Sequence, residues 1–434
     1  MTSRERMVTA MLNKQPDMVP VAPDISNMIP CRLTGKPFWD IYLYNDPPLW
    51  KAYIQAAKHF GFDGWLPSVC AQTRIRNAAI VGRTAERIYL QSYREENGKR
   101  VWAPHVTVYY VADPPTYGVP VEKIGLPRQP EQWEDFVDES EELTEEQALR
   151  AARELMGDDG VLGLHVGIPG LYNDAGIFEY YDNPNLVRDR ARAYEETVEQ
   201  RTREVCEMGP DFVFTGYSGC LTFQTPAIFR DLGLPSLQII TRVAKEYGLP
   251  SQVHSCGPEA KLVEIAAKES DLTSINPLER PPMGDCRLDE IKRDFGADIS
   301  LMGNLHTTEV MLHGTPDLVR RESRWAIDVA AEGGGFILST GDQCGRDTPD
   351  EKPLRHDGDG ARVGEVLRNA AARSGPLPQC GLPAQPREQY AVVIDRTEGR
   401  AALRSTVHGP GPIWSRRRHS RAASRSSISH ALRM

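Results

Sequence analysis

His254 and Cys256 form the strongest local signal for chemistry in the sequence, within the segment Val253-His-Ser-Cys-Gly257. This segment lies where a predicted strand gives way to a predicted helix. In an extended segment, residues two apart point the same way, so the imidazole and the thiolate can face one ion. Because imidazole and thiolate ligands suit zinc, the pair predicts part of a zinc site.

Two ligands do not hold a zinc ion, so other ligands must come from neighbouring strand ends. Cys344, in the segment Gly341-Asp-Gln-Cys-Gly345, follows the last predicted strand and is the natural third ligand. Glu279 follows the next strand after His254 and is a candidate fourth ligand. The alternative is a hydrogen-bonded core histidine, cysteines buried as small apolar side chains, and a glutamate in a surface ion pair. Three residues together at strand ends favour zinc.

Several other polar residues also stand at predicted strand ends, where they are candidates for binding a substrate. Such residues commonly cap a helix or bond to the backbone instead. A further cysteine, Cys220, lies in a loop after a strand, where burial is the default expectation. The candidate substrate-binding residues are Asp24, His165, Tyr217, Asn304 and His306.

The elements that position these residues alternate between apolar runs and amphipathic segments. Strands that alternate with helices imply a parallel sheet, and about eight strands favour a closed (β/α)8 barrel with its active site at the carboxyl ends of the strands. An open doubly wound sheet would need a Gly-rich phosphate loop after its first strand, which is absent. The strand-like runs are Val19–Asp24, Phe62–Leu66, Val161–Val166, Phe212–Thr215, Gln252–His254, Leu272–Asn276, Ile299–Met302 and Phe336–Ser339. The helical segments are Glu5–Leu12, Trp50–Phe60, Leu143–Met156, Leu186–Met208, Ser236–Tyr247, Glu259–Ala267, Arg287–Asp294 and Pro316–Ala331.

Residues 86–125 interrupt this alternation. Two stretches with period-two alternation flank the turn Glu96-Asn-Gly-Lys99, which is typical of a β-hairpin. The sequence therefore predicts an antiparallel excursion in the N-terminal half that covers one side of the barrel.

The composition is that of an ordinary soluble globular protein, with 434 residues, 26% charged and 40% hydrophobic. A net charge of −9 argues against a nucleic-acid partner for the body of the chain. No apolar run approaches the roughly 20 residues needed to cross a bilayer, and the N-terminus lacks the apolar core of a secretory signal. We therefore expect a cytoplasmic protein that does not bind membranes.

The last part of the chain differs in composition. Residues 353–434 hold 14 Arg, no Lys and 6 Asp plus Glu, a net charge of about +8 (14 − 6). We predict a barrel over residues 1–351 and a disordered, Arg-rich tail over residues 352–434.

Five stretches of sequence carry a family resemblance. The chain resembles the uroporphyrinogen decarboxylase-like superfamily, and within it the zinc-dependent methylcobamide:thiol methyltransferases. The resemblance runs from about residue 5 to residue 351 and is dense from residue 210. The stretches are His254-Ser-Cys-Gly, Asp271-Leu-Thr-Ser-Ile-Asn-Pro-Leu, Phe295-Gly-Ala-Asp-Ile-Ser-Leu-Met-Gly-Asn, Gly314-Thr-Pro and Gly333-Gly-Gly-Phe-Ile-Leu-Ser-Thr-Gly.

The resemblance implies a (β/α)8 barrel with Zn2+ on His254, Cys256 and Cys344. Related cobalamin-independent methionine synthases add a glutamate about two dozen residues after the His-x-Cys, and Glu279 matches that spacing. Zinc would turn a thiol into a thiolate that attacks a methyl group on a corrinoid (methylcobamide) partner protein. Glu279 would act in catalysis as the ligand that the thiol displaces. A pterin acceptor and a homodimer are left open.

Two other functions remain from the same resemblance. One is a uroporphyrinogen decarboxylase, but the Arg-rich N-terminal segment with which those enzymes grip substrate carboxylates is absent. The other is a catalytically inactive barrel that keeps the zinc site. Zinc binding together with thiol methylation would separate the methyltransferase from both.

Relatives in the superfamily continue after Thr348-Pro-Asp-Glu into a helix that closes the barrel, whereas here Lys352 begins the Arg-rich tail. With suitable codons, His356-Asp-Gly-Asp-Gly-Ala-Arg shifted by one base reads Met-Met-Glu-Thr-Ala-Arg, a good helix former. The tail is therefore interpreted as a frameshift product, with a genuine basic tail that docks an acidic partner as the alternative.

Overall fold

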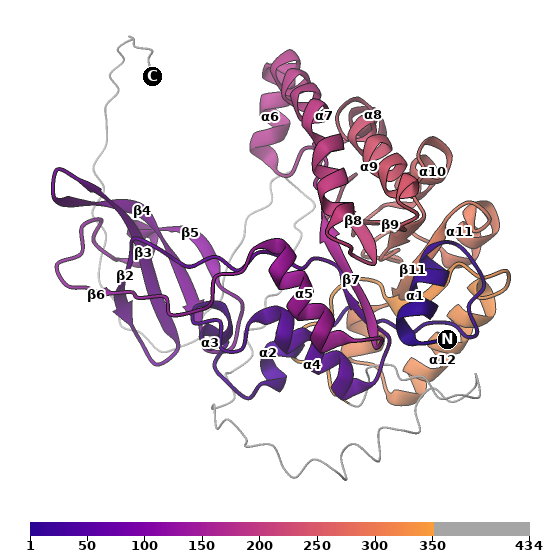
Figure 1. Ribbon diagram of the computed structural model, residues 1–434, viewed down its shortest axis with the longest axis horizontal. Helices are drawn as coiled ribbons and strands as arrows, with labels where there is room; N and C mark the ends of the chain where they lie inside the picture. Colours follow the sequence, from indigo (N-terminus) through magenta and orange to yellow (C-terminus); the bar gives the residue numbers. More distant parts are fainter. Residues whose placement is uncertain (351–434) are drawn as a thin grey trace, which may run out of the picture. The chain divides into compact units, whose positions relative to one another are not determined.

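Seven parallel strands form the central sheet in the computed structural model, which describes residues 1–350 (Figure 1). Every neighbouring pair in the sheet is parallel, so the predicted parallel sheet is confirmed. In spatial order the strands are β1 (Gly64–Leu66), β7 (Gly160–His165), β8 (Phe212–Gly216), β9 (Ser251–His254), β10 (Ser274–Asn276), β11 (Ser300–Leu305) and β12 (Phe336–Thr340).

Helices follow the strands and bury one face each, as predicted. In α9, for example, Leu237, Ile240, Val243 and Ala244 are buried at the spacing of one helical face. The helices are α1 (Ser3–Met11), α2 (Met28–Leu33), α3 (Phe38–Tyr42), α4 (Leu49–Phe60), α5 (Glu145–Met156), α6 (Asp174–Asp182), α7 (Pro184–Glu207), α8 (Pro226–Leu232), α9 (Leu234–Glu246), α10 (Ala260–Glu269), α11 (Leu288–Phe295) and α12 (Pro316–Ala330), with the short turns η1 (Val121–Ile124) and η2 (Thr307–Leu312).

The predicted first strand, Val19–Asp24, is reduced to a single bridge between Val21 and Leu338 of β12. Pro20 and Pro23 have no N–H to donate, so this segment does not form a regular ladder. The segment nevertheless forms backbone hydrogen bonds at both edges of the sheet, with β12 and with the residue before β1. Ala22 N donates to Leu338 O at 2.9 Å, and Asp63 N, just before β1, donates to Val21 O at 2.8 Å. The structure thus has a curled parallel sheet, and the segment around Val21 lies between its two edge strands, β1 and β12.

A buried ion pair holds this segment against α1. Arg6 Nη1 donates to Asp63 Oδ1 at 2.9 Å, while Asp63 Oδ2 accepts a hydrogen bond from Val21 N at 2.8 Å. Arg6 Nε also donates to Asp17 at 2.8 Å. The Arg6 guanidinium of α1 therefore binds Asp63, the residue before β1, and Asp63 in turn binds the bridging segment at Val21 N.

The antiparallel excursion is confirmed as a second sheet of five strands in the order β5-β4-β3-β2-β6. Its central hairpin turns at Asn97 and Gly98, which have φ of +52° and +72°, the conformation of a two-residue hairpin turn. The strands are β2 (Ala78–Arg83), β3 (Arg87–Glu96), β4 (Lys99–Tyr110), β5 (Thr116–Pro120) and β6 (Glu134–Asp135).

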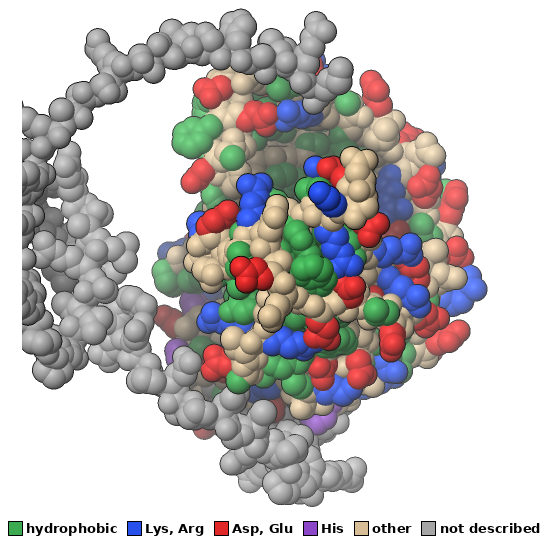
Figure 2. All heavy atoms as spheres, turned by 90° about the vertical axis from the view of Figure 1, so that its left-hand side faces the viewer, with side chains coloured by type: hydrophobic (Ala, Val, Ile, Leu, Met, Phe, Trp, Pro, Cys, Tyr) green, Lys and Arg blue, Asp and Glu red, His purple; other side chains and the backbone are tan. Residues whose placement is uncertain are grey.

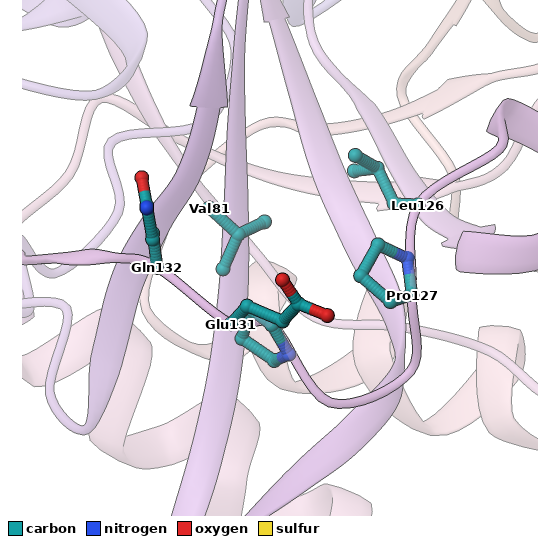
Figure 3. A pocket seen from close by; sticks show the side chains of 6 residues that line it. Val81, Leu126, Pro127, Glu131 and Gln132 are labelled. Carbon is teal, nitrogen blue, oxygen red and sulfur yellow. The ribbon is translucent and has the colours of Figure 1, made fainter.

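A small pocket of about 240 Å³ lies beside this antiparallel sheet (Figure 3). Glu131 is its only ionisable side chain, so the pocket offers little for catalysis. The face of the molecule on this side carries acidic and basic side chains intermixed with apolar ones (Figure 2). The pocket is lined by Val81, Leu126, Pro127, Pro130, Glu131 and Gln132.

Among the described residues, none of the helices has both the length and the apolar character needed to cross a membrane. The predicted disordered tail, residues 352–434, lies outside the described residues.

Candidate metal centre

His254 is the last residue of β9, and its position follows from the parallel register with Gly216 of β8 and Asn276 of β10. The side chain is half-buried, and the ring centroid lies 6.2 Å from that of Phe214. Burial lowers the pKa of the imidazole, although the Asp342 carboxylate opposes this. A neutral imidazole is the form that binds a metal ion.

Cys256 lies in the loop between β9 and α10 and is half-buried. Burial, assisted by the Asp342 carboxylate, raises the pKa of its thiol to about 11, and the nearby Ser218 hydroxyl opposes this shift. The thiol is therefore protonated at neutral pH in the absence of a metal. A bound dication would reverse this and deprotonate it.

Ligand atoms of His254, Cys256 and Asp342 all lie within 4.8 Å of one another, a grouping suited to one metal ion. Asp342 comes from the loop after β12, the same Gly341–Gly345 segment that holds Cys344. The sequence interpretation missed Asp342 because it took the cysteine of that segment as the ligand. The signal was present, since Asp342 is the acidic residue closest to the end of β12.

Cys344 is not part of this group in the described structure. Its side chain is 1% exposed, and its backbone N donates to Asp24 O at 2.8 Å. Burial raises the pKa of the thiol to about 12, with the hydroxyl groups of Thr340 and Thr348 nearby. A ligand role for Cys344 stays a prediction.

Glu279 is buried, with 7% of the residue exposed. Its Oε2 accepts a hydrogen bond from Gly257 N at 2.5 Å, which ties it to the loop of Cys256. Burial raises the pKa of the carboxyl group, Gly257 N lowers it, and Asp342 raises it. Within residues 1–350 it forms no ion pair, so the alternative of a surface ion pair is wrong. Its ligand and catalytic roles stay predictions.

Asp24, Asn304 and His306 are buried around the carboxyl ends of the strands. Burial raises the pKa of the Asp24 carboxyl group to about 7, and Asp342 adds to the shift. His306 caps the η2 turn, because its Nδ1 accepts hydrogen bonds from Thr308 N and Glu309 N at 3.2 Å each. His306 Nε2 is buried without a hydrogen-bond partner among the described residues. Contact with a substrate stays a prediction for all three.

His165 and Tyr217 lie at the ends of β7 and β8. His165 is exposed, and its Nε2 is 3.3 Å from Gly216 O. The Tyr217 hydroxyl accepts a hydrogen bond from Gln224 Nε2 at 2.6 Å, and its ring centroid lies 4.4 Å from that of Tyr172. Their roles in substrate binding stay predictions.

A larger pocket of about 930 Å³ opens next to this tyrosine pair, between the loop after β7 and the helices α6 and α7. Tyr172 lines the pocket and packs against Tyr217 with the two rings tilted by 58°, and the neighbouring Ser218 lies beside the Cys256 thiol. A Cβ added to Gly170, which also lines it, would lie 1.8 Å from the Tyr217 hydroxyl, so only glycine fits there. Tyr172 thus links the pocket to Tyr217 at the end of β8, and the sequence interpretation missed the pocket.

Comparison with known proteins shows what this arrangement resembles. Residues 179–353 match the profile of the family described as uroporphyrinogen decarboxylase (URO-D). A methylated-thiol–coenzyme M methyltransferase of Methanosarcina mazei is 30% identical over 99 residues, which make up 23% of this chain and 24% of that relative. The match thus spans about a quarter of the relative's length.

A solved structure supports the fold over most of the chain. A methyltransferase from Methanosarcina mazei superposes with a TM-score of 0.52 and 16% identity, covering 81% of this chain and 96% of that one. The family match spans the candidate centre from His254 to Cys344. Residues 179–353 therefore resemble the uroporphyrinogen decarboxylase family, and the two Methanosarcina mazei proteins that the chain is similar to are named methyltransferases.

Proposed function

We propose that the protein is a zinc-dependent methyltransferase that moves a methyl group between a corrinoid (methylcobamide) protein and a thiol acceptor. The observation that carries this proposal is the group formed by His254, Cys256 and Asp342 at the carboxyl ends of β9 and β12. Methyltransferases among the relatives support the class of reaction. The whole reaction, its substrates and its partner are proposals for this chain.

The residues present fit a zinc ion. A neutral imidazole, a thiol and a carboxylate are common zinc ligands, and three protein ligands leave a position for a substrate. The Asp342 carboxylate lies close enough to Asp24 and to Glu279 to raise the pKa of each, and none of the three has an ion-pair partner within residues 1–350. A dication would compensate this concentration of acidic groups.

When bound, zinc would supply a positive charge that stabilises the substrate thiol as a thiolate. His254 and Cys256 would hold the ion, and Glu279, whose pKa is raised by burial, would be placed to accept the proton that the thiol loses. The corrinoid carried by the partner protein would supply the methyl group. The pocket beside Tyr172 and Tyr217 offers room for the acceptor or for the edge of the corrinoid.

Metal analysis and a methyl-transfer assay test the proposal. We expect about one zinc per chain in the wild-type protein and a large loss of zinc in Cys256→Ser. Demethylation of free methylcobalamin, followed by its absorbance, is expected with coenzyme M or homocysteine as acceptor. A zinc-free wild-type protein would contradict the proposal. Zinc without transfer to any thiol or pterin would indicate an inactive barrel.

Three further properties belong to the same proposal. The contacts of the Val21 segment with β12 and with the start of β1 support a closed (β/α)8 barrel. A corrinoid carried by a protein requires a docking partner at the carboxyl ends of the strands. We propose that the reaction takes place in the cytoplasm, with no membrane or nucleic-acid partner.

A further inference from the structure

The larger pocket lies beyond the carboxyl end of β7, because the loop after this strand, residues 167–173, forms one of its walls. The other walls come from α6 and α7 and from Leu232 of α8. Parallel α/β folds bind their ligands beyond the carboxyl ends of the strands. The volume of about 930 Å³ is at the upper end of the range for drug-sized ligands, so a small aliphatic thiol would leave most of it unfilled.

Apolar side chains make up most of the walls. Leu171, Ala191 and Leu232 also belong to one buried cluster, so packing fixes this part of the pocket. A ligand with a large apolar surface would bind there because its surface and that of the walls leave water together. The apolar lining residues include Ile168, Leu171, Ala175, Val187, Ala191 and Leu232.

Two tyrosines, Tyr172 and Tyr194, add aromatic rings to the walls. The Tyr172 hydroxyl donates to Ile168 O at 2.6 Å, and the Tyr194 hydroxyl donates to Gly167 O at 2.9 Å. Both acceptors lie in the loop after β7, so these hydrogen bonds fix the rings and the loop relative to each other. Because the hydroxyl hydrogens are already used, the side chains offer mainly their rings to a ligand. Such rings favour a second aromatic ring in an offset or edge-to-face arrangement.

The charged residues of the pocket do not favour an anionic ligand. The charged lining residues are Glu179, Asp182 and Arg190. Arg190 Nη1 lies 2.8 Å from each carboxylate oxygen of Glu179, an ion pair that joins α7 to α6. The one cation among the lining residues is therefore already paired, and Asp182 leaves the rim acidic. An uncharged ligand fits this charge pattern better than an anion does.

Hydrogen bonds connect the pocket wall to the loops after β8 and β9. Gln224, which is 6% exposed, accepts a hydrogen bond from Leu171 N at 3.2 Å and donates one to Cys220 O at 2.8 Å. Cys220 N in turn donates to the hydroxyl of Ser255, the first residue after β9, at 2.8 Å. The wall is thus fastened to the same loops that follow the strands of the candidate metal centre.

We propose that the larger pocket binds an uncharged aromatic small molecule whose ring packs against Tyr172 and Tyr194. Binding needs no metal ion, because none of the lining residues belongs to the group of His254, Cys256 and Asp342. The role of the ligand rests on the proposed function: as the acceptor, it would be a thiol that carries an aromatic ring.

Equilibrium dialysis of the full-length protein tests the class of ligand with three probes. The aromatic and uncharged probe is 2-naphthol, decahydro-2-naphthol is its saturated counterpart, and 2-naphthoate carries a negative charge on the same ring system. We expect 2-naphthol to bind about tenfold more tightly than either of the others. Its affinity should be the same before and after a chelator removes zinc. Equal affinities for the three probes would overturn the proposal.

Variants test whether the probe occupies this pocket. Ala175 is exposed on α6 and lines the pocket, so Ala175→Trp should fill it and abolish binding of 2-naphthol. Phe178→Trp is the matched control, since Phe178 lies on the same helix, is 68% exposed and does not line the pocket; its affinity should not change. Circular dichroism checks that both variants fold.

Tyr172 tests the contribution of the ring. Tyr172→Phe keeps the ring and should change the affinity less than about threefold, whereas Tyr172→Ala should weaken binding about tenfold. Unchanged affinity in Ala175→Trp, or equal affinities in the two Tyr172 variants, would overturn the assignment of the pocket. A wild-type protein that binds 2-naphthol as expected but holds no zinc would instead overturn the proposed function alone.

Discussion

Glu259 should make the stability of the protein depend on pH between about 5 and 8. It precedes α10 and is 2% exposed. Its Oε1 accepts a hydrogen bond from Leu221 N at 2.9 Å, but its Oε2 is buried without a partner among the described residues. Burial raises the pKa of this carboxyl group from 4.5 to about 7, and Leu221 N and Ser255 oppose the shift. We therefore expect Glu259→Gln to stabilise the protein at alkaline pH.

The sign and size of the expected change in stability with pH follow from the linkage between proton binding and folding. Because the pKa is raised in the folded state, the stabilising contribution of the protonated carboxyl group is complete below about pH 4.5 and is lost as pH rises through about 7. A shift of this size corresponds to roughly 3 kcal/mol, of which about 2.5 kcal/mol falls between pH 5 and pH 8. An unfolding entropy of about 2.1 cal/mol/K per residue over residues 1–350 converts this to about 3 °C in Tm.

The assay is thermal unfolding of both proteins at pH 5 and at pH 8, with the same metal content. Glutamine cannot ionise, so the Tm of Glu259→Gln relative to wild type should rise by about 3 °C from pH 5 to pH 8. Glu264→Gln is the matched control on α10, since Glu264 is ion-paired with Lys261 and its pKa is lowered. The control should show no such rise. An equal pH response in the two variants would refute the reasoning for Glu259.

Three further outcomes follow from other parts of the structure. Arg6→Met leaves the buried carboxylate of Asp63 without its cation and should cost about 3–5 kcal/mol of unfolding free energy in urea; a loss under about 1 kcal/mol would show that this pair does not hold the bridging segment. Gly170→Ala should displace Tyr217 and raise KM for the acceptor while zinc content stays near one per chain; an unchanged KM would exclude the larger pocket from substrate binding. The protein should not decarboxylate uroporphyrinogen, and turnover of about 1 per second or more would contradict this.

The sequence predicted the secondary structure well, because the apolar runs and amphipathic segments have unambiguous periods. Seven strands and eight of the helices lie close to where periodicity placed them, whereas the short helices α2, α3, α6 and α8 were not predicted. A further difference is the segment Val19–Asp24. Its apolar side chains fit a strand, but two prolines limit it to one bridge, and the backbone contacts that join it to the sheet are not visible in a pattern of side chains.

The candidate site was predicted in part. His254 and Cys256 were identified because their spacing puts both on one side of an extended segment, and the structure groups them. The sequence interpretation took Cys344 as the third ligand and did not consider Asp342, which the structure groups with His254 and Cys256. Which of two nearby residues reaches the site depends on the loop conformation after β12, where φ of Asp342 is +149° and the Cys344 backbone bonds to Asp24. Likewise, Tyr172 lines the larger pocket through a loop whose path no periodicity describes.

The charge at the site bears on the choice between methyl transfer and decarboxylation. A porphyrinogen with many carboxylates needs several cationic side chains to bind it. Asp24, Glu279 and Asp342 instead gather around His254 and Cys256, and no arginine or lysine in residues 1–350 forms an ion pair with any of the three. Such a site repels a polyanion and attracts a metal cation. A bound dication would offset part of this negative charge, as the proposed methyl transfer to a thiolate requires.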